Sequence, residues 1–143
     1  MMKKLLLLAL TAAFLVLALA GCSGAEKLTE YDFGADKIPT VNAVIGETRK
    51  VNGVATGTEN GVRYKTYKYQ SDTVLEDLRE YYLHLDELDW ALLEDFNLND
   101  STGRIYVGNE SADAGKIITI TISFTQTSYE VKIEKYDGTL TRG

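Results

Sequence analysis

The most regular pattern in the chain is an alternation of apolar and polar residues between positions 116 and 126. Threonines and a serine separate the apolar members, which are Ile118, Ile120, Ile122 and Phe124. A period of two predicts a β-strand with one apolar face. After a tight connection at Thr127-Ser128 the alternation resumes and continues to about residue 136, which predicts a further strand.

Two earlier strands are predicted on either side of Asn60-Gly61, at residues 49–59 and Val62–Gln70. An Asn-Gly pair tolerates the positive φ values of a type I′ turn and is therefore a strong hairpin signal. With this pair as the loop, the predicted register sets Glu59 against Val62, Gly57 against Tyr64 and Val54 against Tyr67.

A helix is predicted from Val74 to Glu87. Thr73 and Glu76 have the spacing of a capping box, in which two side chains satisfy unpaired backbone donors at the start of a helix. At helical periodicity one apolar stripe forms, consisting of Val74, Leu75, Leu78, Tyr81, Tyr82, Leu85 and Leu88. This stripe predicts that the helix covers one face of a sheet, whereas Leu83 falls outside it.

Shorter apolar segments complete the predicted order of elements. Residues 90–96 and 104–109 are predicted strands, and residues 41–46 are a short strand or an irregular apolar entry to the fold. The order is typical of the α+β class. We expect an antiparallel sheet made of a hairpin, a helix and then a three- to four-stranded meander, with the one helix packed on one face.

A single domain is expected from residue 38 to residue 137, with Pro39 at its entry and a tail at residues 138–143. Small and polar residues dominate the segment 22–37, which is predicted to be a flexible tether. Tyr31 and Phe33 are the large apolar residues that leave this prediction open, because they either belong to the tether or pack against the edge of the domain.

Residues 1–21 have the features of a secretory signal: Lys3 and Lys4, an apolar run and small residues before a cleavage site. The uncharged run at residues 5–20 would form about 24 Å of helix, which is short of the ~30 Å hydrocarbon core of a bilayer. A spanning helix is therefore the weaker alternative.

The run ends in Leu19-Ala20-Gly21-Cys22, which carries the one cysteine of the chain. These four residues resemble the lipobox of bacterial lipoprotein precursors, in which an aliphatic residue and two small residues precede cysteine. The resemblance covers residues 1–24 and implies that the sulfur of Cys22 receives lipid and that the signal peptide, residues 1–21, is removed. It also implies a location at the cell membrane, facing the extracytoplasmic side. The alternative is a lone cysteine after an ordinary signal peptide.

The charge of the chain argues against nucleic acid as a partner. Its formal net charge is −6, and removal of residues 1–21 takes away Lys3 and Lys4 but no acid, so the mature chain carries −8. An acidic surface of this kind repels phosphate backbones. With Cys22 acylated, no thiol remains for a disulfide, and the domain depends on its core for stability.

Few residues suggest a chemical site, and no metal or cofactor is expected. His84 is the one histidine of the chain and lacks an identifiable catalytic partner, so it is interpreted as a boundary residue. Residues 95–100 resemble the opening of an EF-hand loop, but Asp100 and Tyr106 replace its glycine and its bidentate glutamate.

Tyrosines are the stronger candidates for a binding surface. Four of the nine tyrosines, all on predicted strands, form the candidate ligand surface: Tyr64, Tyr67, Tyr69 and Tyr106. Exposed tyrosines stack on sugars or hold a peptide, although strand propensity explains tyrosines in a sheet equally well.

Together these features predict a lipid-anchored binding module of the bacterial envelope, whose partner is another envelope protein, a peptide or a cell-wall glycan. Two alternatives stay open. One is an envelope glycan hydrolase with two carboxylates across a cleft. The other is an inhibitor of a secreted enzyme that inserts a loop such as residues 97–103.

Overall fold

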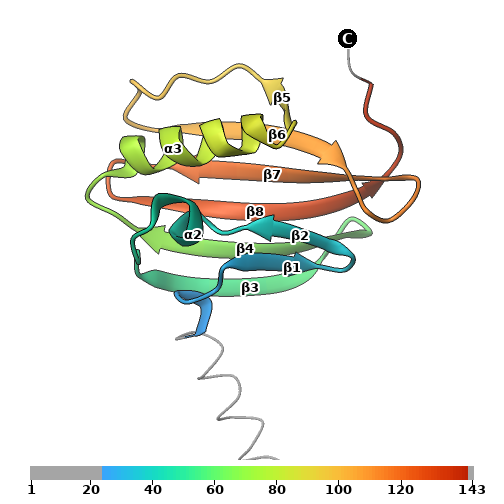
Figure 1. Ribbon diagram of the computed structural model, residues 1–143, viewed down its shortest axis with the longest axis horizontal. Helices are drawn as coiled ribbons and strands as arrows, with labels where there is room; N and C mark the ends of the chain where they lie inside the picture. Colours follow the sequence, from blue (N-terminus) through green and yellow to red (C-terminus); the bar gives the residue numbers. More distant parts are fainter. Residues whose placement is uncertain (1–23, 142–143) are drawn as a thin grey trace, which may run out of the picture.

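The computed structural model describes residues 24–141, so the predicted signal peptide and Cys22 lie outside the described residues. The elements in chain order are β1 (Glu30–Phe33), β2 (Asp36–Pro39), α2 (Val41–Ile45), β3 (Val51–Glu59), β4 (Val62–Gln70), α3 (Val74–Glu87), β5 (Ala91–Glu94), β6 (Gly103–Glu110), β7 (Lys116–Phe124) and β8 (Ser128–Asp137). Antiparallel pairing joins them into a two-stranded and a six-stranded sheet (Figure 1). The predicted α+β class is confirmed.

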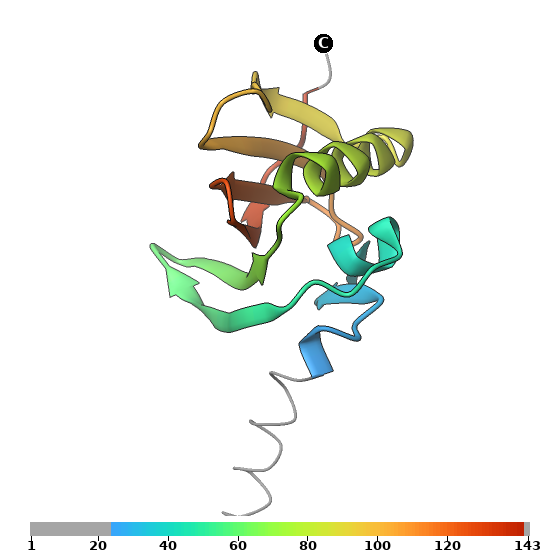
Figure 2. The same ribbon diagram turned by 90° about the vertical axis from the view of Figure 1, so that its left-hand side faces the viewer.

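The large sheet has the strand order β3-β4-β8-β7-β6-β5. After β4 the chain passes through α3 to β5, which is the edge strand on the other side of the sheet from β3. From β5 the strands run in sequence order back across the sheet, and β8 pairs with β4. In Figure 2, α3, α2 and the β1–β2 hairpin lie on the same side of this sheet. One hydrophobic cluster fills the space between them and the sheet, so a single core holds the described residues together.

The β3–β4 hairpin has the predicted register, with Glu59 opposite Val62, Gly57 opposite Tyr64 and Val54 opposite Tyr67. Asn60 and Gly61 both have positive φ, 52° and 79°, as a type I′ turn requires. Gly57 has a second role, because the hydroxyl of Tyr64 lies 2.7 Å from where its Cβ would be. The ring of Tyr64 therefore lies across β3, where only glycine leaves room for it.

The bounds predicted for the long helix, Val74 to Glu87, are confirmed by α3. The predicted capping box is wrong, because the side chain of Thr73 caps no backbone N–H. Its hydroxyl donates instead to Asp77 Oδ1 at 3.0 Å. Two members of the predicted stripe are also exposed, Leu75 at 37% and Leu88 at 45%, since they lie at its margins.

The segment predicted as a tether is largely folded. Residues 30–39 form the β1–β2 hairpin, in which Tyr31 is fully buried and Phe33 is 5% exposed. Ala25 is also buried, at 3% exposure. The prediction of a flexible segment up to residue 37 is therefore wrong, as is the domain boundary at residue 38. Tyr31 and Phe33 occupy alternate positions of β1, so both side chains point to the same face of the hairpin, into the core.

Residues 41–46 were expected as a short strand or an irregular segment, but they form the short helix α2. The side chain of Thr40 accepts a hydrogen bond from Ala43 N at 3.1 Å and caps its start. Gly46 ends it in the left-handed region, at φ 71°. Both capping signals are present in the sequence, one on each side of the segment.

Candidate functional site

The structure divides the four candidate tyrosines between the core and the opposite face of the sheet. Tyr67 is 5% exposed and Tyr69 is fully buried, so the prediction of one exposed patch is wrong for both. The ring of Tyr67 packs against Tyr31 with centroids 4.6 Å apart, and Tyr69 stacks on Tyr129 at 5.3 Å. These two tyrosines stabilise the core rather than bind a ligand.

Tyr64 and Tyr106 are half-buried on the face of the sheet opposite α3. They lie on β4 and β6, with β8 and β7 between them, and three strand spacings amount to about 14 Å. The ammonium group of Lys132 lies over the ring of Tyr64, 5.1 Å from its centroid. The two tyrosines are therefore separate features and do not form a clamp around one ligand.

The face of the sheet between Tyr64 and Tyr106 is tightly packed and polar. Thr119 is 2% exposed, and its hydroxyl lies beside that of Tyr136. Burial, and then the neighbouring carboxylate of Glu134, raise the pKa of Tyr136 to about 12. The Tyr136 hydroxyl is therefore harder to ionise than that of an ordinary tyrosine, and it stays protonated in moderately alkaline solution as well.

A buried charge network at the start of α3 was not predicted from the sequence. Asp77 is 3% exposed and accepts from Arg49 at 2.9 and 3.0 Å. The hydroxyls of Ser71, Thr73 and Tyr129 also donate to its carboxylate. The three hydroxyls and the guanidinium satisfy the carboxylate fully, which indicates a structural role joining α3 to the sheet.

The pKa of Asp77 reflects both its burial and its hydrogen bonds. Burial on its own would raise the pKa of this carboxyl, but the hydrogen bonds from Arg49 and from the three hydroxyls outweigh it and lower the pKa below its ordinary value. No short-range pattern could have identified this network, because Arg49 and Asp77 are 28 residues apart in the sequence.

A second network fastens the β1–β2 hairpin to the end of β8. Lys135 lies 2.7 Å from a carboxylate oxygen of Asp36 and 2.7 Å from one of Asp113, and it also donates to the carbonyl of Phe33 at 3.0 Å. Asp36 in turn accepts from Ser111 and from Ala112 N. The hairpin is thus fixed at its turn by charge as well as by its buried aromatic residues.

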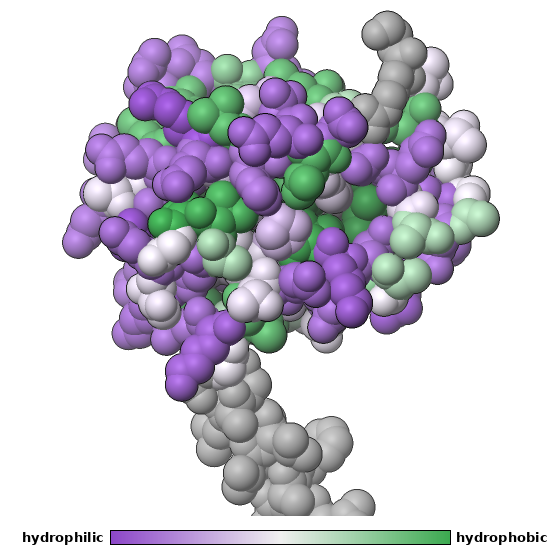
Figure 3. Space-filling model, in the orientation of Figure 1, coloured by the Kyte–Doolittle hydropathy of each residue, from purple (hydrophilic) through white to green (hydrophobic). Residues whose placement is uncertain are grey.

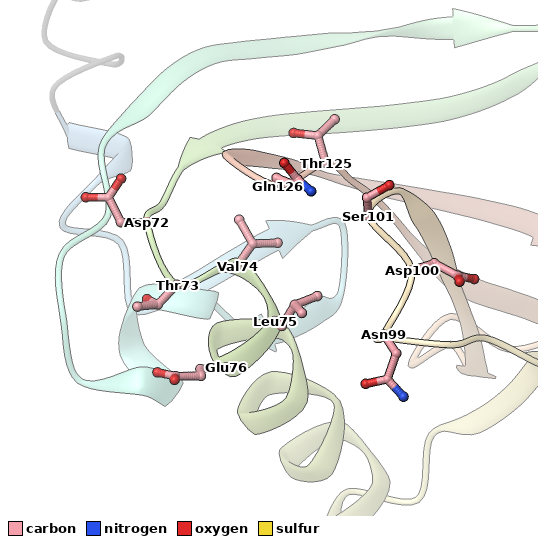
Figure 4. Close-up of a pocket in the computed structure, with 10 residues that line it drawn as sticks. All are labelled: Asp72, Thr73, Val74, Leu75, Glu76, Asn99, Asp100, Ser101, Thr125 and Gln126. Atoms are coloured by element: carbon pink, nitrogen blue, oxygen red, sulfur yellow. The ribbon is translucent and has the colours of Figure 1, made fainter.

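One cleft, of about 350 Å³, lies where α3 begins and is drawn in Figure 4. Val74 and Leu75 occupy its middle, with Ser101 and Gln126 beside them. Its three carboxylates belong to Asp72, Glu76 and Asp100. Asp72 and Glu76 point to one side and Asp100 to the other (Figure 4). Carboxylates that diverge in this way do not form the facing pair of a glycan hydrolase.

A second cleft, of about 460 Å³, lies at one end of the sheet. Three hairpin turns surround it, those of β1–β2, β3–β4 and β6–β7, and all three lie at the same end of the molecule, on the right in Figure 1. We refer to it as the three-turn cleft. A Cβ at Gly34 would lie 3.1 Å from the ammonium of Lys135, so the first turn rests directly on this side chain. The volume is within the range of small-ligand sites.

Figure 3 shows the face that carries α2, α3 and the first hairpin, where hydrophilic residues separate several small hydrophobic areas. His84 has a side chain 39% exposed and lies 3.9 Å from Glu87, in agreement with a boundary position. Within residues 24–141 no group of three His, Cys, Asp or Glu side chains converges as metal ligands.

Comparison of the chain with protein-family models, with curated proteins and with solved structures finds no match.

Proposed function

We propose that this protein is a lipid-anchored binding protein on the extracytoplasmic side of a bacterial membrane. The observation that carries the proposal is the complete lipobox, Leu19-Ala20-Gly21-Cys22. Two or more acyl chains at Cys22 would give stable attachment, because a single acyl chain gives marginal and reversible binding. Among residues 24–141, no helix is long and apolar enough to serve as a membrane span.

The start of the domain supports a short attachment. Glu26 Oε1 accepts from Val51 N at 3.0 Å, and the side chain of Asn42 donates to Glu26 O at 3.1 Å. Ala25, which is buried, comes three positions after Cys22, and three residue steps of extended chain span at most about 11 Å. A lipid on Cys22 would therefore hold the folded domain next to the membrane surface.

Binding is favoured over catalysis by the character of the clefts. The carboxylates of the cleft at α3 diverge, whereas the three-turn cleft is a preformed concavity with charged walls. The partner we propose is a molecule of the envelope: a protein, a peptide or a glycan.

The test is the state of Cys22 in protein produced in a bacterial host. Mass spectrometry of the mature chain is expected to find fatty acid on Cys22 and no residue before it. A Cys22→Ala variant should remain uncleaved, whereas Ser23→Ala, which leaves the thiol intact, should be acylated normally. A mature N-terminus free of fatty acid would refute the proposal.

A further inference from the structure

The three-turn cleft concentrates positive charge on an acidic protein. Its walls include four cationic side chains, Arg63, Lys65, Lys116 and Lys135, and two carboxylates, Asp113 and Asp137. Twelve lysines and arginines lie within residues 24–141, so a third of them line this one concavity. The cleft is therefore locally basic, although the net charge of the chain is −6.

Two of the four cations are already neutralised by acids. Lys135 is held by Asp36 and Asp113, and Lys116 lies 3.3 Å from Asp137. These two side chains shape the wall, and little of their charge is left for a ligand.

The other two cations have no carboxylate partner among residues 24–141. Arg63 contacts the ring of Phe33, 6.0 Å from its centroid, and Lys65 Nζ donates to the carbonyl of Asp32 at 2.7 Å. They are two residues apart on one face of β4, which places their Cα atoms about 7 Å from each other. An anion bound between them would relieve their mutual repulsion.

We propose that the three-turn cleft binds a phosphate group through Arg63 and Lys65. The guanidinium offers a planar pair of donors to phosphate oxygens, and the ammonium adds a mobile point charge. The volume of about 460 Å³ has room for a phosphate and the group esterified to it. An envelope origin for this phosphate ester rests on the proposed function, whereas the binding of phosphate by the cleft does not.

The experiment is a calorimetric titration of the full chain in neutral detergent with inorganic phosphate, and with acetate and chloride at the same ionic strength. Phosphate should bind saturably and more tightly than acetate. Arg63→Gln and Lys65→Gln should each weaken phosphate binding about tenfold or more, since hydrogen bonds to charged groups are among the stronger ones. Lys68→Gln is the matched control, because Lys68 lies on the opposite face of β4 and is exposed.

Three results would overturn the inference: no saturable binding of phosphate, acetate binding as tight as phosphate binding, or an equal loss in Lys68→Gln. The phosphate that the cleft binds could belong to a small ester or to a segment of a polymer, and titrations with glycerol phosphate and with poly(glycerol phosphate) distinguish these two sources. Tighter binding of the monomer assigns a small ester, and tighter binding per phosphate of the polymer assigns a polymer segment. If the mature chain carries no fatty acid on Cys22 but still binds phosphate, the proposed function is refuted and the phosphate site is not.

Discussion

Asp77 is the residue on which the described structure depends most directly, because its carboxylate accepts five hydrogen bonds from four side chains. In Asp77→Asn the amide would turn N–H donors toward the donors of Arg49 and of the hydroxyls. Removing one partner of a buried ion pair costs about 3 kcal/mol, so urea should unfold the variant at a lower concentration. Asp86→Asn, at an exposed position of the same helix, should change stability by no more than about 0.5 kcal/mol. An equal effect of both substitutions would contradict this account.

The acid sensitivity of the protein should come from two carboxyls. Burial would raise the pKa of Asp36, but hydrogen bonds from Lys135, Ser111 and Ala112 N lower it, as the partners of Asp77 lower the pKa of that residue. A carboxyl whose pKa is lowered by folding stabilises the fold above its ordinary pKa, and this stability is lost as the pH falls through the folded value.

The free energy of unfolding should therefore be constant near neutral pH and should fall from about pH 5 towards pH 2. Urea titrations across this range measure it. Asp77→Asn and Asp36→Asn should each show a shallower decline than the unsubstituted chain. Three identical pH profiles would show that neither carboxyl is responsible.

At this scale the sequence indicated the types of residues that matter but not their neighbours. Tyrosines were identified as the residues of interest, yet Tyr67 and Tyr69 belong to the core and Arg63 and Lys65 were not identified. Whether a side chain on a strand is buried in the core or free to bind a ligand depends on which other elements cover that strand. Here the covering element is the β1–β2 hairpin, which was itself missed.

At the scale of elements, the β1–β2 hairpin is the part of the core most open to test. Phe33 is 5% exposed, and its ring contacts Lys135 and Arg63, 5.4 and 6.0 Å from its centroid. Phe33→Ala should lower the free energy of unfolding by about 3 kcal/mol, as for other buried aromatic residues. Leu83→Ala, at a residue 53% exposed on α3, is the control.

A chain that begins at Ile38 tests the whole hairpin. If residues 22–37 were a flexible tether, their removal would leave the stability of the domain unchanged. A chain that begins at Ile38 lacks Tyr31 and Phe33, which belong to the core, and it lacks the hydrogen bond between Glu26 and Val51 at the start of β3. That loss is a large part of the 5–15 kcal/mol that stabilises a typical domain, so cooperative thermal unfolding should disappear. A chain beginning at Gly24 should retain it. Cooperative unfolding of both chains would mean that the hairpin is dispensable, as the prediction of a flexible tether requires.

Long periodic elements were predictable because their pattern is decided within the element itself. The bounds of α3 and the register of β3 and β4 follow from apolar spacing and from Asn60-Gly61. The strand order could not be predicted, since the pairing of β8 with β4 joins residues about 65 positions apart in the sequence. The short strands β1 and β2 were missed for a related reason: four residues give too little periodicity to detect.

At the scale of the whole molecule, the fold and the proposed anchor together define an orientation. Glu26 contacts the start of β3, which is one edge of the large sheet, and β5 forms the other edge. Five strand spacings separate these edges by about 24 Å. With acylated Cys22 within about 11 Å of Ala25, the β3 edge should face the membrane and the β5 edge should face away from it.

This orientation can be measured by energy transfer from a dye on the protein to acceptor lipids in vesicles. Because Cys22 is acylated in the anchored chain, a thiol introduced by Lys27→Cys or Asp95→Cys can be labelled selectively. Lys27 follows the buried Ala25, and Asp95 is exposed just beyond β5. Transfer should be markedly stronger from position 27. Inserting about fifteen Gly/Ser residues between Ser23 and Gly24, a coil spanning on the order of 20 Å, should reduce that difference because the domain can then rotate. Equal transfer from both positions in the chain without the insertion would mean that the lipid leaves the domain free to turn.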